Sequence, residues 1–141
     1  EAIEGRPGEE LMFPVRARLA TNSQEVLRHL RAGHEMVSAR TYGIFALTFW
    51  WNSILALVEA RQWESIEEFC GPFERFMAAA PLPFGTLIIE YARVLASFMN
   101  GDRSQLLTTR LRTLSDEVEQ MDLHTLRPLL EEALAACRVS P

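Results

Sequence analysis

The chain lacks lysine, so all 14 of its basic residues are arginine, and its formal net charge is −5. An acidic protein without a basic cluster is poorly suited to bind nucleic acids or anionic membranes in general. The arginines are spread along the sequence, which favours the codon bias of a GC-rich genome over selection for anion binding. We therefore expect no direct nucleic-acid partner.

Cysteine and histidine are also scarce. The two cysteines, Cys70 and Cys137, lie far apart on expected apolar helix faces, so we expect free thiols. The three histidines, His29, His34 and His124, lack metal-ligand spacing and have no cysteine cluster nearby. The sequence therefore predicts no metal and no cofactor. Because no secretory signal opens the chain and no disulfide scaffold is indicated, we expect a cytoplasmic protein.

Motifs of common enzyme classes are missing as well. There is no glycine-rich phosphate loop, no nucleophile elbow and no cysteine–histidine pair. Carboxylates cluster twice, but each cluster falls on the polar side of an amphipathic helix, where solvated side chains are the rule. We expect no catalytic residues and no enzymatic activity. These carboxylates are Glu67, Glu68, Glu74, Asp116, Glu117 and Glu119.

Two long apolar stretches are the main positive feature, one at residues 41–58 and one at residues 84–99. Each carries a narrow polar stripe, and an ordinary amphipathic segment follows each. This pattern is typical of stacked helical hairpins in which one helix of each pair is nearly buried. The sequence therefore predicts an all-α fold, and no segment shows the alternation of a strand.

The first stretch approaches the length of a membrane-spanning helix, which needs about 20 apolar residues. Polar residues interrupt it, charged residues bound it, and no basic cluster marks a cytoplasmic side. We therefore expect no membrane insertion. The residues in question are Thr48, Asn52 and Ser53 inside the stretch, and Arg40 and Glu59 at its ends.

Periodicity and turn signals divide the chain into an N-terminal arm at residues 1–22, expected to be partly disordered, and a single tetratricopeptide-like helical-repeat domain at residues 23–141. Residues 1–10 are expected to be loose and include a run that resembles a protease-cleavage linker. Residues 11–19 are compatible with a short helix or an extended arm, since Pro14 weakens a helix. The expected helices lie at residues 24–39, 41–61, 66–80 with a kink at Pro72, 84–100, 105–121 and from 125 onward.

Several details of these helices are also predicted. Ser23 is a plausible N-cap, and Asp102 with Gln105 resembles a capping box. The inward faces of two helices follow helical spacing. These faces comprise Ile66, Phe69, Phe73, Phe76 and Ala80 in one helix, and Leu107, Leu111, Leu114, Val118 and Met121 in the other.

An internal repeat is suggested by two similar turns, residues 61–66 and residues 101–106, which are 40 residues apart. Expected helix starts near residues 41, 84 and 125 have a similar spacing. We therefore expect antiparallel helical hairpins stacked as a tetratricopeptide-like right-handed solenoid with about 40 residues per repeat.

The polar stripes supply the candidate binding residues. At about 100° per residue, Thr48 and Asn52 share an arc of one apolar helix, and Glu90, Arg93 and Ser97 share an arc of the other. In a solenoid such stripes face the concave surface, where partners dock. We expect the two stripes to open into one groove. The alternatives are that the stripes are merely solvated, or that Glu90 and Arg93 pair with each other.

A family resemblance rests on residues 38–49, the turn at 61–64, residues 91–102, and residues 123–135 with Arg127-Pro128. Together they resemble the tetratricopeptide-like C-terminal region of large bacterial regulators, in which an ATPase module and helical repeats join a cyclase or DNA-binding output domain. The resemblance implies a protein-interaction or effector-sensing module of a signalling or transcription regulator, without catalytic residues.

Two alternatives from other classes remain open. One is a stand-alone helical domain that binds a small effector between its second and fourth helices. The other is a dimerisation module, so a homodimer is also compatible with the sequence. For the interaction module that the resemblance implies, the expected partner is another protein or another domain of a larger chain.

Overall fold

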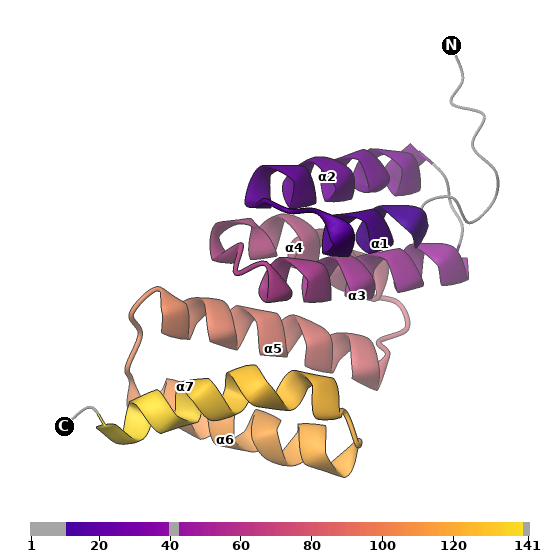
Figure 1. The fold of residues 1–141 in the computed structure, drawn as a ribbon. Helices are drawn as coiled ribbons and strands as arrows, with labels where there is room; N and C mark the ends of the chain where they lie inside the picture. The colour runs from indigo at the N-terminus through magenta and orange to yellow at the C-terminus, as the bar shows by residue number, and fades with distance from the viewer. Residues whose placement is uncertain (1–10, 40–42, 140–141) are drawn as a thin grey trace. The chain divides into compact units, whose positions relative to one another are not determined.

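The computed structural model describes residues 11–39 and 43–139, and helix is the only regular secondary structure in these two ranges. Expectations for residues 1–10 and for the helix start near residue 41 lie outside the described residues. Seven α-helices and two short 3-10 helices account for most of the described residues (Figure 1). The expected all-α class is therefore confirmed. The elements are α1 (Met12–Leu19), α2 (Ser23–Ala39), α3 (Gly43–Glu59), η2 (Trp63–Ser65), α4 (Ile66–Phe76), α5 (Pro83–Met99), α6 (Gln105–Gln120), η3 (His124–Leu126) and α7 (Arg127–Val139).

The chain forms two compact units, Glu1–Ile89 and Glu90–Pro141, and the division falls within α5. In the first unit α1 packs against both α2 and α3, and α3 packs against α4. In the second unit α6 and α7 form an antiparallel pair (Figure 1).

Helix α1 occupies the segment for which the sequence left a short helix and an extended arm open. Pro14 lies in the first turn, where a missing backbone donor costs little. Pro14 and Ala17 are buried, and the small Gly33 of α2 lets Phe13 approach closely. The segment is therefore an integral part of the first unit.

The core of the first unit is aromatic. Phe49, Phe69 and Phe73 are fully buried, and Trp50 is nearly so. Phe49 and Trp50 come from α3, whereas Phe69 and Phe73 lie on the predicted inward face of α4. The predicted face of α4 was wrong at its end, because the helix stops at Phe76. Phe76 is consequently exposed, Ala80 lies beyond the helix, and Met77 takes the buried position instead.

The core of the second unit follows the predicted face of α6, where Leu107, Leu111, Leu114 and Val118 are buried. The prediction was wrong for Met121, which is exposed because α6 ends one residue before it. Leu126, Leu130 and Ala133 supply the buried side of η3 and α7.

Two predicted N-caps are displaced by one or two residues. Asn22, rather than Ser23, caps α2, since its Oδ1 accepts from the backbone N–H of Glu25 at 3.0 Å. Ser104, rather than Asp102, caps α6, since its Oγ accepts from Leu107 N at 3.2 Å. The sequence placed these helix starts correctly to within a turn, but side-chain geometry selects the cap.

Three helices end in the same way. Arg61, Gly101 and Asp122 adopt positive φ after α3, α5 and α6, and each is followed by a backbone N–H that bonds five residues back. A 3-10 turn then follows Arg61 and Asp122, whereas Gly101 leads to an extended Ser104. The solenoid and its period of about 40 residues stay a prediction.

Candidate functional site

The five predicted binding residues are divided between the two units, and all five are half-buried. Thr48 and Asn52 lie on α3 in the first unit. Glu90, Arg93 and Ser97 lie on the second unit's part of α5. Each polar stripe is therefore described by itself, and their union into one groove stays a prediction.

On α3 the stripe is tied to its own helix. Thr48 Oγ1 donates to the carbonyl of Ile44 at 3.0 Å, and Asn52 Nδ2 donates to the carbonyl of Thr48 at 2.8 Å. Both contacts span one helical turn, so they hold the side chains close to the helix surface. The Asn52 amide has an acceptor, Oδ1, in addition to the donor used here. This oxygen can accept a hydrogen bond from a bound partner.

A groove lies beside these two residues, between α1 and α3. Its volume is about 210 Å³. An ion pair joins the same two helices, in which Arg18 Nη2 lies 2.9 Å from Glu59 Oε1. The walls of the groove are mainly apolar on the α1 side and polar on the α3 side. They comprise Leu11, Pro14, Val15, Arg18, Thr48 and Asn52.

The exposed surface of α1 continues this groove as an apolar stripe. Met12, Val15 and Leu19 are 46%, 48% and 78% exposed, and their spacing of three and four residues aligns them along one side of the helix. Ile44, near the start of α3, is exposed as well. We call Met12, Val15 and Leu19 the α1 stripe. Exposed apolar residues that follow helical spacing mark a binding face more often than scattered ones do.

The sequence does not predict the α1 stripe, because residues 11–19 read as part of an N-terminal arm. Helical spacing of Met12, Val15 and Leu19 was the available signal. Pro14 obscured it, and so did the second apolar side of this helix, formed by Phe13, Pro14 and Ala17. A helix that is apolar on two sides has no clear amphipathic period.

In the second unit the stripe on α5 engages α6. Glu90 Oε1 lies 3.5 Å from Arg110 Nε, so Glu90 has an ion-pair partner on another helix. The carbonyl of Ser97 accepts from Asp102 N at 3.1 Å in the turn that ends α5. Arg103 lies over the Phe98 ring, 3.8 Å from its centroid, and donates to the Phe98 carbonyl. Of the predicted stripe, the Glu90 side chain thus joins α5 to α6, and Ser97 contributes its backbone carbonyl to the turn.

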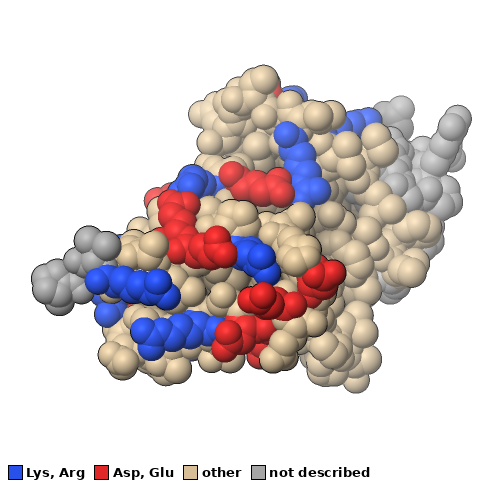
Figure 2. Space-filling model, turned by 60° about the horizontal axis from the view of Figure 1, so that its bottom comes forward, with Lys and Arg blue, Asp and Glu red and all other residues tan. Residues whose placement is uncertain are grey.

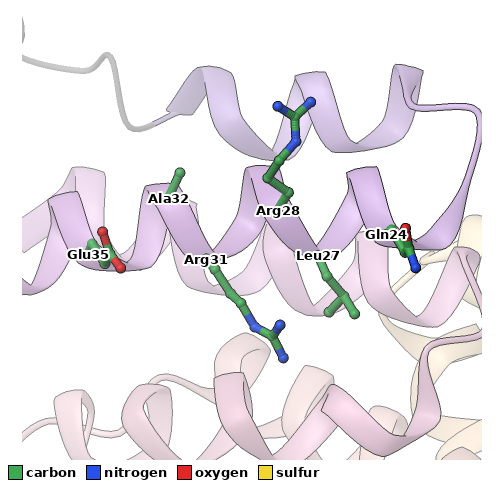
Figure 3. A pocket seen from close by; sticks show the side chains of 6 residues that line it. All are labelled: Gln24, Leu27, Arg28, Arg31, Ala32 and Glu35. Carbon is green, nitrogen blue, oxygen red and sulfur yellow. The ribbon is translucent and has the colours of Figure 1, made fainter.

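A second hollow runs along α2, but all its walls come from one helix. Figure 3 shows Arg28 and Arg31 pointing to different sides of α2, so the hollow does not surround a ligand. Arg31 is engaged with Glu68 of α4 through two hydrogen bonds of 2.9 and 3.0 Å. The hollow is lined by Gln24, Leu27, Arg28, Arg31, Ala32 and Glu35.

Positive and negative side chains do not form separate patches on the face drawn in Figure 2. Arginine and acidic side chains are interleaved on this face. Within residues 11–39 and 43–139, no three metal-ligating side chains come together. None of the helices that the structure describes is long and apolar enough to cross a membrane. The groove between α1 and α3 with the adjoining α1 stripe is thus the best-formed candidate site.

Comparison with protein-family models, with curated proteins and with solved structures gives no match.

Proposed function

We propose that this chain is a non-catalytic protein-interaction module that binds its partner through the α1–α3 surface. The observation that supports this most directly is the α1 stripe, an aligned set of exposed apolar side chains next to a groove. Burial of apolar surface contributes about 25 cal/mol per Å². Burial of this stripe by a partner would therefore favour association, whereas its exposure to water does not stabilise the isolated chain.

The wider setting we propose is the one the sequence resembles: a tetratricopeptide-like right-handed solenoid within a cytoplasmic bacterial signalling or transcription regulator. The similar ends of α3, α5 and α6 support a repetitive architecture. The paired packing of α3 with α4, and of α6 with α7, supports helical hairpins as its units. The regulator setting rests on the sequence resemblance alone.

Binding of a small effector is less well supported. Pockets for drug-sized ligands usually exceed about 300 Å³ and enclose most of the ligand. The groove between α1 and α3 has about 210 Å³. It suits one large side chain of a partner better than a whole metabolite.

Site-specific photocrosslinking in the native host tests this proposal. A benzophenone amino acid placed at Val15 or Leu19 should yield a discrete crosslinked species, which mass spectrometry identifies. The same probe at Leu106, an exposed leucine of α6, is the matched control. Leu19→Ser combined with the probe at Val15 should abolish the crosslink. Equal crosslinking at Leu106, or none at either α1 position, would refute the proposed surface.

A further inference from the structure

The α1 stripe is bordered by arginine on both sides. At about 100° per residue, Arg16 follows Met12 around the helix, and Arg18 precedes Val15. Both arginines are exposed, and α1 contains no acidic residue. The helix therefore presents an apolar seam with an arginine on each side.

We propose that the α1 stripe binds an amphipathic helix of a partner protein whose apolar face is flanked by glutamate or aspartate. This inference rests on the proposed function and specifies the chemistry of its partner. Two helices that pack along an apolar seam choose partners through the charges beside the seam. Carboxylates on the partner would face Arg16 and Arg18, and its apolar residues would cover Met12, Val15 and Leu19.

Of the two arginines, Arg16 is the more available to pair with a carboxylate of the partner. Its guanidinium carbon lies 5.5 Å from the centroid of the Phe13 ring, which places it over an aromatic face of its own helix. A planar guanidinium so placed can still form a bidentate pair with a carboxylate. Arg18 is already paired with Glu59, so its positive charge is partly compensated. The preference for an acidic partner should therefore depend mainly on Arg16.

The groove adds a position for one apolar side chain. Leu11 and Val15 line one side, and Thr48 and Asn52 of α3 line the other, with Leu11 directly before the first residue of α1. A leucine or phenylalanine of the partner would enter on the apolar side. The Oδ1 atom of Asn52 would accept a hydrogen bond from a polar group beside it. This mixture of depth and polarity favours a protein helix.

Two other occupants fit the chemistry less well. A second copy that used the same helix would bring Arg16 and Arg18 near their own equivalents, and like charges across an interface oppose association. An anionic membrane would meet Glu59 beside the groove and a chain whose net charge is −5. Both occupants are outcomes of the experiment below.

The test uses two synthetic amphipathic peptides of about 18 residues, long enough to form helix on binding. Both carry leucine along one face, and the flanking positions are glutamate in one and lysine in the other. Fluorescence anisotropy with the full chain should show roughly tenfold or greater preference for the glutamate peptide, weakened by salt. Arg16→Glu should reverse that preference. Leu19→Ser should weaken binding of the glutamate peptide roughly tenfold, and the control Leu106→Ser should leave it unchanged.

The proposal is overturned if both peptides bind equally, if neither binds, or if Leu19→Ser has no effect. It is also overturned if the chain binds vesicles with one-quarter phosphatidylserine more tightly than the glutamate peptide, or if it dimerises and Leu19→Ser abolishes the dimer. Crosslinking at Val15 distinguishes failure of the proposed interaction surface from failure of the proposed acidic partner. A partner captured there without acidic preference would leave the interaction surface in place and remove only the partner's charge. Loss of both results would remove the surface itself.

Discussion

The imidazole of His34 lies edge-on to the indole of Trp50, with ring centroids 4.9 Å apart and an interplanar angle of 75°. On another side it meets the ring of Phe69 at 5.6 Å. Burial against these apolar rings disfavours the charged imidazolium and lowers the pKa of His34 below its ordinary value of 6.5. The carboxylates of Glu68 and Glu35 act in the opposite direction, but desolvation is the larger effect.

Stability should therefore depend on pH through His34. Below about pH 6.5 the unfolded chain binds a proton that the folded chain resists, so the free energy of unfolding falls as pH decreases through this window. Thermal melts between pH 7.5 and 5.5 should show a falling midpoint. His34→Gln should flatten this dependence.

The control for this prediction is His29→Gln, which replaces the other histidine of α2 and leaves the ring contacts of His34 with Trp50 and Phe69 in place. This variant should keep the slope of the parent. A His34→Gln variant with the parental slope would show that another group is responsible, and would contradict the assignment.

Gly33→Ala should destabilise the first unit. A Cβ at this position would lie 2.5 Å from Cε2 of Phe49 and 2.9 Å from Cβ of Phe13. Alanine gains about 1 kcal/mol in helix propensity over glycine. Overpacking against atoms that cannot yield costs about 1–3 kcal/mol or more. We expect a net loss of about 1–2 kcal/mol in urea unfolding, with α1 displaced.

Gly85→Ala is the matched comparison within the same unit. A Cβ there would first meet the flexible end of Met77, which can move aside, and then Cζ of Phe73 at 3.0 Å. Gain in helix propensity and local repacking should nearly cancel. If Gly33→Ala and Gly85→Ala changed stability equally, close approach of α1 to Gly33 would not be what constrains this position.

Helix content and most buried positions could be predicted because apolar spacing reports them directly. Leu30, Phe69, Phe73 and Leu111 are examples, since each has no exposed surface and each falls on a periodic face. The ends of the faces were less predictable. Phe76 is exposed because α4 ends there, and periodicity carries no information about where a backbone stops.

The candidate site was only partly predictable. Thr48 and Asn52 could be found as polar positions on an apolar helix, and both line the groove. The facing wall could not be found, because contact of α1 with α3 joins residues about 35 positions apart in sequence. No local pattern encodes that contact. Gly33 of α2 lies where Phe13 of α1 and Phe49 of α3 come close together.

Ser104→Ala should destabilise the second unit by about 1 kcal/mol, the usual cost of losing an N-cap. The Ser104 hydroxyl accepts from Leu107 N, and no comparable bond comes from the Asp102 side chain to the first turn of α6. Asp102 accepts instead from Ser104 N at 2.8 Å, which lowers its pKa. Chemical denaturation of Ser104→Ala and Gln105→Ala measures the difference. A larger loss of stability in Gln105→Ala than in Ser104→Ala would support the predicted capping box of Asp102 and Gln105 instead.

Ser53→Ala should stabilise the protein. Ser53 has no exposed surface, and its hydroxyl has no hydrogen-bond partner among the described residues. An orphaned buried polar group costs about 1–3 kcal/mol, and alanine is also the better helix former by several tenths of a kcal/mol. We expect the free energy of unfolding to rise by about 1–2 kcal/mol with an unchanged urea dependence. Ser115→Ala, at a half-buried position of α6, controls for helix propensity alone. If the two variants gained equally, the Ser53 hydroxyl would carry no desolvation penalty. A loss of stability in Ser53→Ala would mean that its oxygen is hydrogen-bonded in solution, and would contradict the packing of α3 described above.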